Sequence, residues 1–79
     1  MAENIQQRVI EVVARTLKID EAQITGDSRF VEDLGAESMQ SVELIAAFEE
    51  EFDIEMDERE ALDVKTVEKA VNFIARHLG

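Results

Sequence analysis

The sequence predicts an all-α fold: a small bundle of three main helices plus one short helix, with a long loop between the first and second helices. Three observations support this prediction. Apolar residues recur at helical spacing in three segments, no segment alternates apolar and polar residues as a half-buried strand does, and proline is absent. With 79 residues, the chain has the length of a single domain, residues 1–79, and is too short for two.

The first helix is predicted over three to four turns, from an apolar stripe formed by Ile5, Val9, Val12, Val13 and Leu17. The helical period then fails over residues 18–36, where Gly26, Asp27, Ser28 and Gly35 supply turn-forming residues. We therefore expect a long loop without regular structure. Apolar side chains would anchor it to the core, namely Ile24, Phe30, Val31 and Leu34.

A second helix is predicted from Ser38 to about Phe52, with a core side made of Leu44, Ile45, Phe48 and Phe52. A short helical turn follows at residues 58–62. The last helix has Thr66 as a fitting N-cap, and its predicted buried stripe consists of Val67, Ala70, Val71, Ile74 and Leu78.

Acidic residues dominate the charge of the chain. There are 19 Asp and Glu against 8 Lys and Arg, which gives a net charge of -11. Residues 30–63 hold 13 of the acids and only one base, Arg59, so this middle segment carries a net charge of -12. Such a chain repels phosphate backbones and anionic lipid headgroups, and we expect binding to neither nucleic acid nor membranes.

The start of the chain, Met1-Ala2-Glu3-Asn4, has neither the basic nor the apolar region of a signal peptide, and no apolar run approaches the length of a bilayer span. A cytoplasmic protein is therefore expected.

Catalytic machinery is not apparent in the sequence. Cysteine is absent and His77 is the sole histidine, in a last helical turn where interaction with the helix dipole explains it. Residues 53–57 resemble the start of a calcium loop, but Glu58 stands where an EF-hand has glycine and Val64 where it has glutamate. We expect neither an enzyme nor a metal site.

One motif carries specific information. Residues 30–39 read Phe-Val-Glu-Asp-Leu-Gly-Ala-Glu-Ser-Met, and an acidic helical segment follows that includes Val42-Glu43-Leu44 and Glu49-Glu50-Glu51-Phe52. This arrangement resembles the acyl carrier protein family, whose signature is Asp-Leu-Gly-x-Asp-Ser-Leu leading into an acidic helix. The resemblance covers nearly the whole chain.

The resemblance implies that Ser38 receives 4′-phosphopantetheine from coenzyme A. The chain would then carry acyl intermediates as thioesters and deliver them to enzymes of fatty-acid, polyketide or related biosynthesis. A serine at a helix N-terminus suits a phosphate, because free N–H groups and the helix dipole favour an anion there, and Gly35 lets the preceding chain turn. The alternative is that Ser38 only caps the helix.

The resemblance also implies partners: a phosphopantetheinyl transferase, and acyl-transferring and chain-modifying enzymes with basic surfaces that meet a monomeric carrier. A stripe at i, i+4, i+7 and i+11 begins beside Ser38 and lies away from the core side. The residues expected to recognise partners are Glu37, Met39, Glu43, Ala46, Glu49 and Glu50.

Members of the family shelter acyl chains inside the bundle. The residues expected to line such a cavity are Phe30, Ile45, Phe48, Met56, Ala61, Val64, Ala70 and Phe73, all of which would be core residues in any helical bundle. Phe48 stands where relatives often have leucine. We therefore hypothesise a preference for short or polar acyl groups.

Three residues around Ser38 depart from the family signature. Glu37 replaces aspartate, Met39 replaces leucine, and Gln40 replaces a common acidic residue. All three belong to the surface that a phosphopantetheinyl transferase would recognise. These departures favour a carrier dedicated to a particular pathway. Two alternatives stay open: an acidic helical interaction module with Ser38 unmodified, and a peptidyl carrier.

Overall fold

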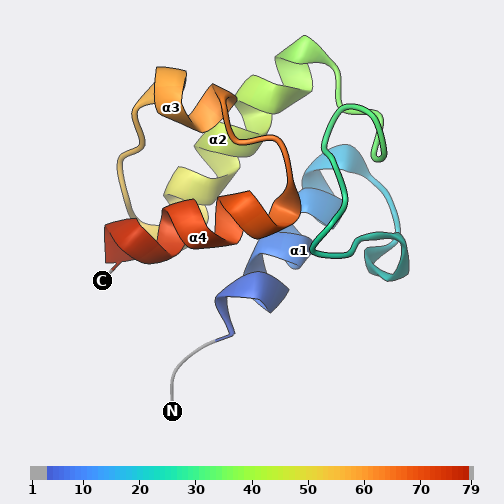
Figure 1. Cartoon of the computed structure of the whole chain (residues 1–79), viewed down its shortest axis with the longest axis horizontal. Helices are drawn as coiled ribbons and strands as arrows, with labels where there is room; N and C mark the ends of the chain where they lie inside the picture. Colours follow the sequence, from blue (N-terminus) through green and yellow to red (C-terminus); the bar gives the residue numbers. More distant parts are fainter. Residues whose placement is uncertain (1–3, 79) are drawn as a thin grey trace.

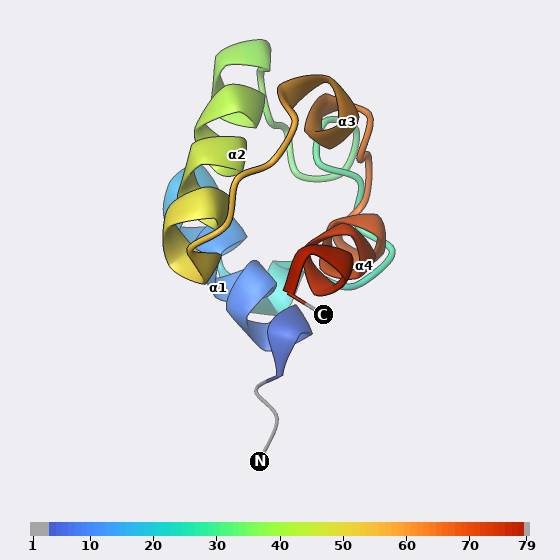
Figure 2. The same cartoon turned by 90° about the vertical axis from the view of Figure 1, so that its left-hand side faces the viewer.

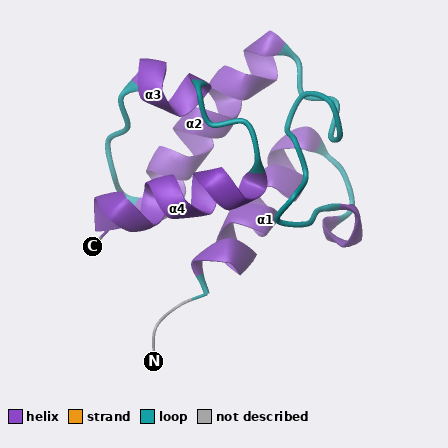
Figure 3. Cartoon of the chain, in the orientation of Figure 1, coloured by secondary structure: helices purple, strands orange, loops and turns teal. Residues whose placement is uncertain are grey.

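Four α-helices make up most of the described chain, residues 4–78, in the computed structural model (Figure 1). They are α1 (Ile5–Leu17), α2 (Ser38–Phe52), α3 (Glu58–Leu62) and α4 (Val67–Leu78), and no strand occurs in this part of the chain (Figure 3). The all-α prediction is confirmed. Residues 1–3, most of the segment that was compared with a signal peptide, and Gly79 lie outside the described residues.

Side chains at the helix ends explain the helix bounds. The Asn4 Oδ1 accepts the Gln7 N–H at 3.1 Å and begins α1, which ends at Lys18 in the left-handed conformation with φ 60°. The Asp57 carboxylate accepts the Arg59 N–H at 2.9 Å and begins α3. The predicted cap Thr66 accepts the Lys69 N–H at 3.2 Å through Oγ1, at the start of α4. Local chemistry therefore sets these boundaries.

The core lies between α1, α2 and α4. Helix α1 packs against both α2 and α4, while α3 lies against α2 (Figure 2). Val9, Val13, Val67 and Ile74 are fully buried where these helices meet. Burial of such side chains is the main favourable term in folding.

Arg8 ties α1 to the end of α2. Its guanidinium donates to the Glu51 carboxylate, with Nε to Oε2 at 3.1 Å, and to the Glu51 main-chain oxygen at 2.8 Å. The same group lies 4.4 Å from the centre of the Phe52 ring, and Arg15 approaches the other Glu51 oxygen at 3.9 Å. Arg8 thus holds the acidic helix α2 against α1, and its guanidinium lies over the ring of Phe52, a core residue.

The loop between α1 and α2 is more ordered than the sequence predicted. It contains a 3-10 helix, η1 (Glu21–Gln23), capped by the Asp20 carboxylate, and an isolated bridge between Arg29 and Thr66. Three main-chain bonds tie the loop to the start of α4: Phe30 N–H to Lys65 O at 3.0 Å, Val67 N–H to Ser28 O at 3.0 Å, and Glu68 N–H to Gly26 O at 2.9 Å. The predicted long loop is present, but it contains one short 3-10 helix and is ordered by these bonds to residues far along the chain, neither of which the sequence predicted.

Several apolar side chains differ in burial from the prediction. In the loop, Ile24 and Phe30 are buried and Leu34 packs half-buried against the core, but Val31 is 56% exposed, and Ala36 is a buried residue that the prediction missed. Leu78, predicted to be buried at the end of the last helix, is 46% exposed. Ile5, Val71 and Ile45 are only half-buried, which puts them at the margins of their apolar stripes.

The gathering of acidic residues in the middle of the chain predicts that its thermal stability depends on the salt concentration. Within residues 30–63 only Asp33 and Glu51 form ion pairs with described residues, so the other acids repel one another. We expect the melting temperature to rise as salt increases from about 0.01 M to about 1 M, because the Debye length falls from about 30 Å to about 3 Å. Thermal melts followed by circular dichroism test this. A melting temperature that ignores salt would contradict it.

None of the helices in residues 4–78 has the length and apolar character needed to cross a bilayer.

Candidate functional site

Ser38 is the first residue of α2 and is exposed to solvent. The residue in the N-cap position is Glu37, whose N–H donates to the Gln40 side-chain Oε1 at 3.0 Å. The Ser38 hydroxyl forms no hydrogen bond with any described residue. Capping therefore does not explain this serine, and Gln40, a departure from the family signature, has a structural role beside it.

The N-termini of α2 and α4 differ in how their N–H groups are used. At α4 the N–H groups of Val67 and Glu68 bond to loop carbonyls and that of Lys69 bonds to Thr66. At α2, no described residue accepts the N–H groups of Ser38 and Met39. Free N–H groups at a helix N-terminus, together with the helix dipole, favour an anion. The surroundings of the Ser38 hydroxyl are thus suited to a phosphate group.

A tight turn leads the chain to Ser38. Gly35 has φ +74°, a left-handed conformation that disfavours other residues. A Cβ at this position would meet no atom within 4 Å, so the backbone angle, not a lack of space, requires glycine. The Ala36 N–H closes the turn on the Phe30 carbonyl at 2.8 Å.

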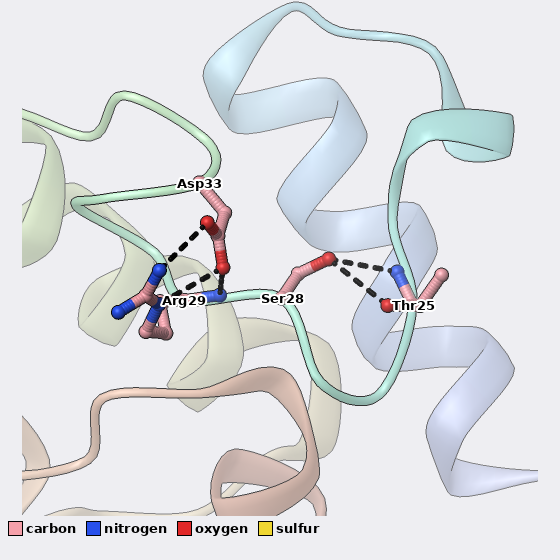
Figure 4. Close-up of polar contacts among 4 residues, drawn as sticks. All are labelled: Thr25, Ser28, Arg29 and Asp33. Carbon is pink, nitrogen blue, oxygen red and sulfur yellow. Dashed lines mark hydrogen bonds and ion pairs between the residues drawn. The ribbon is translucent and has the colours of Figure 1, made fainter.

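Arg29 and Asp33 hold this turn together (Figure 4). The Asp33 carboxylate accepts the Arg29 N–H at 2.8 Å and two guanidinium bonds, Nε to Oδ2 at 3.1 Å and NH2 to Oδ1 at 3.2 Å. These hydrogen bonds lower the pKa of Asp33 below its ordinary value, the side-chain bond from Arg29 most strongly, and hydrogen bonding to Asp33 raises the pKa of Arg29. On the other side of Arg29, the buried Ser28 hydroxyl accepts the Thr25 N–H at 2.9 Å.

We expect Asp33→Asn to loosen this turn at neutral pH but not in acid. A carboxylate whose pKa is lowered by folding stabilises the folded state above its unfolded pKa, near 3.8, and this contribution is lost as the pH falls through the lower folded value. Hydrogen exchange of the Arg29 amide measures the effect directly. The variant should exchange faster than the wild-type chain at pH 7, and the difference should shrink below about pH 4. A difference that does not change with pH would refute a role for the charge.

Beneath Ser38, a cavity of about 80 Å³ lies between α2, α3, α4 and the turn. All eight residues predicted to line a cavity do line it: Phe30, Ile45, Phe48, Met56, Ala61, Val64, Ala70 and Phe73. Val31, Glu32, Ser41, Leu44, Leu62 and Lys65 complete the lining. Of these, Val31 and Leu62 are exposed apolar residues.

Ser38 is aligned with this cavity along α2. Ser41 and Ile45 follow it at i+3 and i+7, on the same side of the helix, and both line the cavity. At 1.5 Å per residue, Ser38 stands about 4.5 Å along the axis beyond Ser41. A group attached to Ser38 would therefore begin one helical turn outside the cavity.

Most of the predicted recognition residues form an exposed stripe along α2, on the side of the helix away from the residues that line the cavity. Met39 is 75% exposed, and Glu43, Ala46 and Glu50 are exposed along the same side of α2, as is Glu37 before it. Val42, also exposed, widens the apolar part of the surface.

Glu49 differs from the other residues of the predicted recognition set. It is half-buried, and its carboxylate accepts the Met56 N–H at 2.8 Å. Its main-chain oxygen accepts the Ile54 N–H at 3.1 Å. Glu49 thus shapes the connection from α2 to α3, a role that sequence reasoning missed because its partner lies beyond the end of the helix.

His77 packs against Phe73, the residue one turn before it on α4. The His77 Nδ1 lies 3.0 Å from the Phe73 carbonyl oxygen, and the two rings are 4.7 Å apart. Over residues 4–78, no group of three or more His, Asp or Glu side chains is placed to hold a metal ion. The features that stand out chemically are an exposed hydroxyl and the apolar cavity next to it.

Comparison with known families gives a match over most of the chain. A sequence model of the family described as "Phosphopantetheine attachment site" matches residues 7–74, which include all of α2 and α3, most of α1 and α4, and the loop before Ser38. Domains of this family carry a covalently attached 4′-phosphopantetheine group and are carriers, not catalysts. The chain therefore belongs to the phosphopantetheine-attachment family, as its resemblance to acyl carrier proteins implied.

Proposed function

We propose that Ser38 is the attachment site and that the chain is an acyl carrier protein of a specialised biosynthetic pathway. The observation that supports this most strongly is the exposed Ser38 hydroxyl, unbonded within residues 4–78 and one turn outside the cavity. The cytoplasmic location and the monomeric state remain predictions.

In the proposed loading step, the Ser38 oxygen attacks the phosphorus of the pantetheine phosphate in coenzyme A. The pyrophosphate bond breaks, adenosine 3′,5′-bisphosphate leaves, and the hydroxyl proton passes to the transferase. When bound, the group supplies a terminal thiol that holds an acyl chain as a thioester. The N-terminus of α2 stabilises the phosphodiester charge beside Ser38.

The chain's own residues then have two tasks. The cavity below Ser38 takes up the acyl chain and removes it from water, which is favourable for apolar groups. The exposed stripe of Met39, Glu43, Ala46 and Glu50, with Glu37, faces partner enzymes. Complementary charge speeds and orients encounters with a basic surface while the complex stays weak enough to release.

Intact-mass measurement tests the proposal. The chain is incubated with coenzyme A and a phosphopantetheinyl transferase of broad specificity, and we expect a mass increase of one phosphopantetheinyl group per chain. Incubation with acyl-coenzyme A should add the acylated group. A chain that stays unmodified with several transferases would instead favour an acidic helical interaction module.

A peptidyl carrier shares the same attachment chemistry. Competition between acyl-transferring and aminoacyl-transferring enzymes for the modified chain separates the two. The acidic stripe on α2 favours acyl-transferring enzymes with basic surfaces as the partners.

A further inference from the structure

We infer that Gln40 is a positioning residue for the loading step, because its side chain holds the start of α2 in a form that leaves the Ser38 hydroxyl free. The inference rests on the proposed attachment at Ser38. It follows from a competition between two neighbouring residues, Glu37 and Ser38, for the N-cap position of one helix.

The N-cap residue of α2 differs in type from those of the other helices in residues 4–78, η1 included. Each of the others has a side-chain oxygen that accepts a main-chain N–H of the first turn; they are Asn4, Asp20, Asp57 and Thr66. Asparagine, aspartate, serine and threonine are the types that N-cap positions prefer. Helix α2 instead has Glu37 there, although a serine follows directly.

A hydrogen bond to Gln40 accounts for this choice. The Gln40 Oε1 accepts the Glu37 N–H at 3.0 Å, which is the back-bond of a capping box. The Glu37 carbonyl accepts the Ser41 N–H at 2.9 Å. Both main-chain polar groups of Glu37 are thus bonded within the first turn, and the peptide that joins Glu37 to Ser38 is held in one orientation.

Without the Gln40 bond, the serine competes for the N-cap position. The helix would then begin one residue later, and the Ser38 hydroxyl would accept an N–H of the first turn. Thr66 shows this arrangement at α4, which begins directly after it, where the Thr66 Oγ1 accepts the Lys69 N–H at 3.2 Å. A serine oxygen used in this way is turned toward the helix, and attack on phosphorus would have to break its hydrogen bond.

Gln40 is separate from the surface proposed for partner enzymes. It is half-buried, whereas Ser38 and Met39 are exposed. A shift of the helix start by one residue leaves the later turns of α2, with Glu43 and Glu50, in place. The transferase would therefore still bind a chain that lacks the Gln40 bond, and we expect the loss in turnover.

Three variants separate positioning from other effects. Gln40→Met keeps the approximate size of the side chain but removes its oxygen. Gln40→Glu keeps an oxygen that can accept the Glu37 N–H and should rescue loading. Gln23→Met is the matched control, because the Gln23 Oε1 accepts the Asp20 N–H at 3.4 Å and so makes the same kind of bond at the start of η1 in the long loop.

Loading is followed by intact mass with coenzyme A and a phosphopantetheinyl transferase of broad specificity, at several concentrations of the chain. For Gln40→Met we expect kcat to fall about fivefold, the factor that loss of a typical helix cap produces, while KM stays within about twofold of the wild-type value. Gln40→Glu and Gln23→Met should keep the wild-type kcat.

NMR of the unmodified chain tests the competition at the helix start directly. The Ser38 Cα and Cβ chemical shifts report its backbone angles. They should move from helical toward extended values, as for an N-cap residue, in Gln40→Met but in neither of the other variants. Gln40→Ala removes the same oxygen and gives the same test if Gln40→Met does not fold.

A wild-type kcat in Gln40→Met, or a loss that lies in KM alone, would overturn the inference. An equal fall of kcat in Gln23→Met, or unchanged Ser38 chemical shifts in Gln40→Met, would also overturn it. If the wild-type chain and every variant stay unloaded, the attachment at Ser38 is refuted, and this inference with it. A wild-type chain that loads while Gln40→Met loads equally fast refutes only the inference.

Discussion

Ser38→Ala is expected to abolish phosphopantetheinylation completely, because the modified oxygen is removed. The fold should survive. Ser38 is exposed and its hydroxyl bonds to no residue within 4–78, and surface substitutions of this kind change the free energy of unfolding by about 0.5 kcal/mol or less. Intact mass after incubation with coenzyme A and transferase measures the loss, and circular dichroism checks the fold.

Ser41→Ala is the matched control for this loss. Ser41 lies one turn further along α2, and its hydroxyl donates to the Glu37 carbonyl at 3.3 Å. It lines the cavity but does not stand at the helix N-terminus. We expect this variant to be modified as readily as the wild-type chain. Modification of Ser38→Ala, or its loss in Ser41→Ala instead, would place the attachment site elsewhere.

The second large effect concerns charge on α2. Glu43→Lys combined with Glu50→Lys should lower kcat/KM for a transferase with a basic surface by at least about tenfold at low salt, because electrostatic steering changes association rates by factors of 10 to 10³. Added salt should reduce the gap between variant and wild type. Both carboxylates are exposed, and neither forms an ion pair with a described residue.

A second double variant separates the position of the charge from its amount. Glu11→Lys with Asp27→Lys changes the net charge equally but alters exposed residues of α1 and the long loop. We expect it to retain most of the wild-type kcat/KM. Equal losses in both double variants would mean that net charge alone matters, and no loss in the α2 variant would remove this stripe as the partner surface.

Much of the fold follows from local patterns. The first residue of α2, the bounds of α3 and the cap at Thr66 were all predicted, because N-capping residues and apolar spacing act within one or two turns. The residues around the cavity could be predicted for a similar reason. A small bundle has a single interior, so the apolar residues of neighbouring helices must all pack there.

The predictions failed where contacts cross long stretches of sequence. The loop is ordered by bonds from Ser28 and Phe30 to the start of α4, which no local pattern encodes. Val31, expected to anchor the loop, and Leu78, which fits the apolar spacing of the last helix, are both exposed, because neither hydrophobicity nor periodicity shows which neighbouring element covers a side chain. The internal roles of Glu49 and Glu51 depend on partners in other segments.

The sequence by itself therefore determined the helices, the acidic surface and the serine at the start of α2, since these depend on residue type and short spacing. Only the tertiary structure decided that the Ser38 hydroxyl is unbonded among the described residues, that a cavity of about 80 Å³ lies one helical turn from it, and that Arg29 and Asp33 hold the turn before it. The physical reason is that cavity volume and hydrogen-bond partners depend on how distant segments pack, which a linear pattern of polarity does not contain.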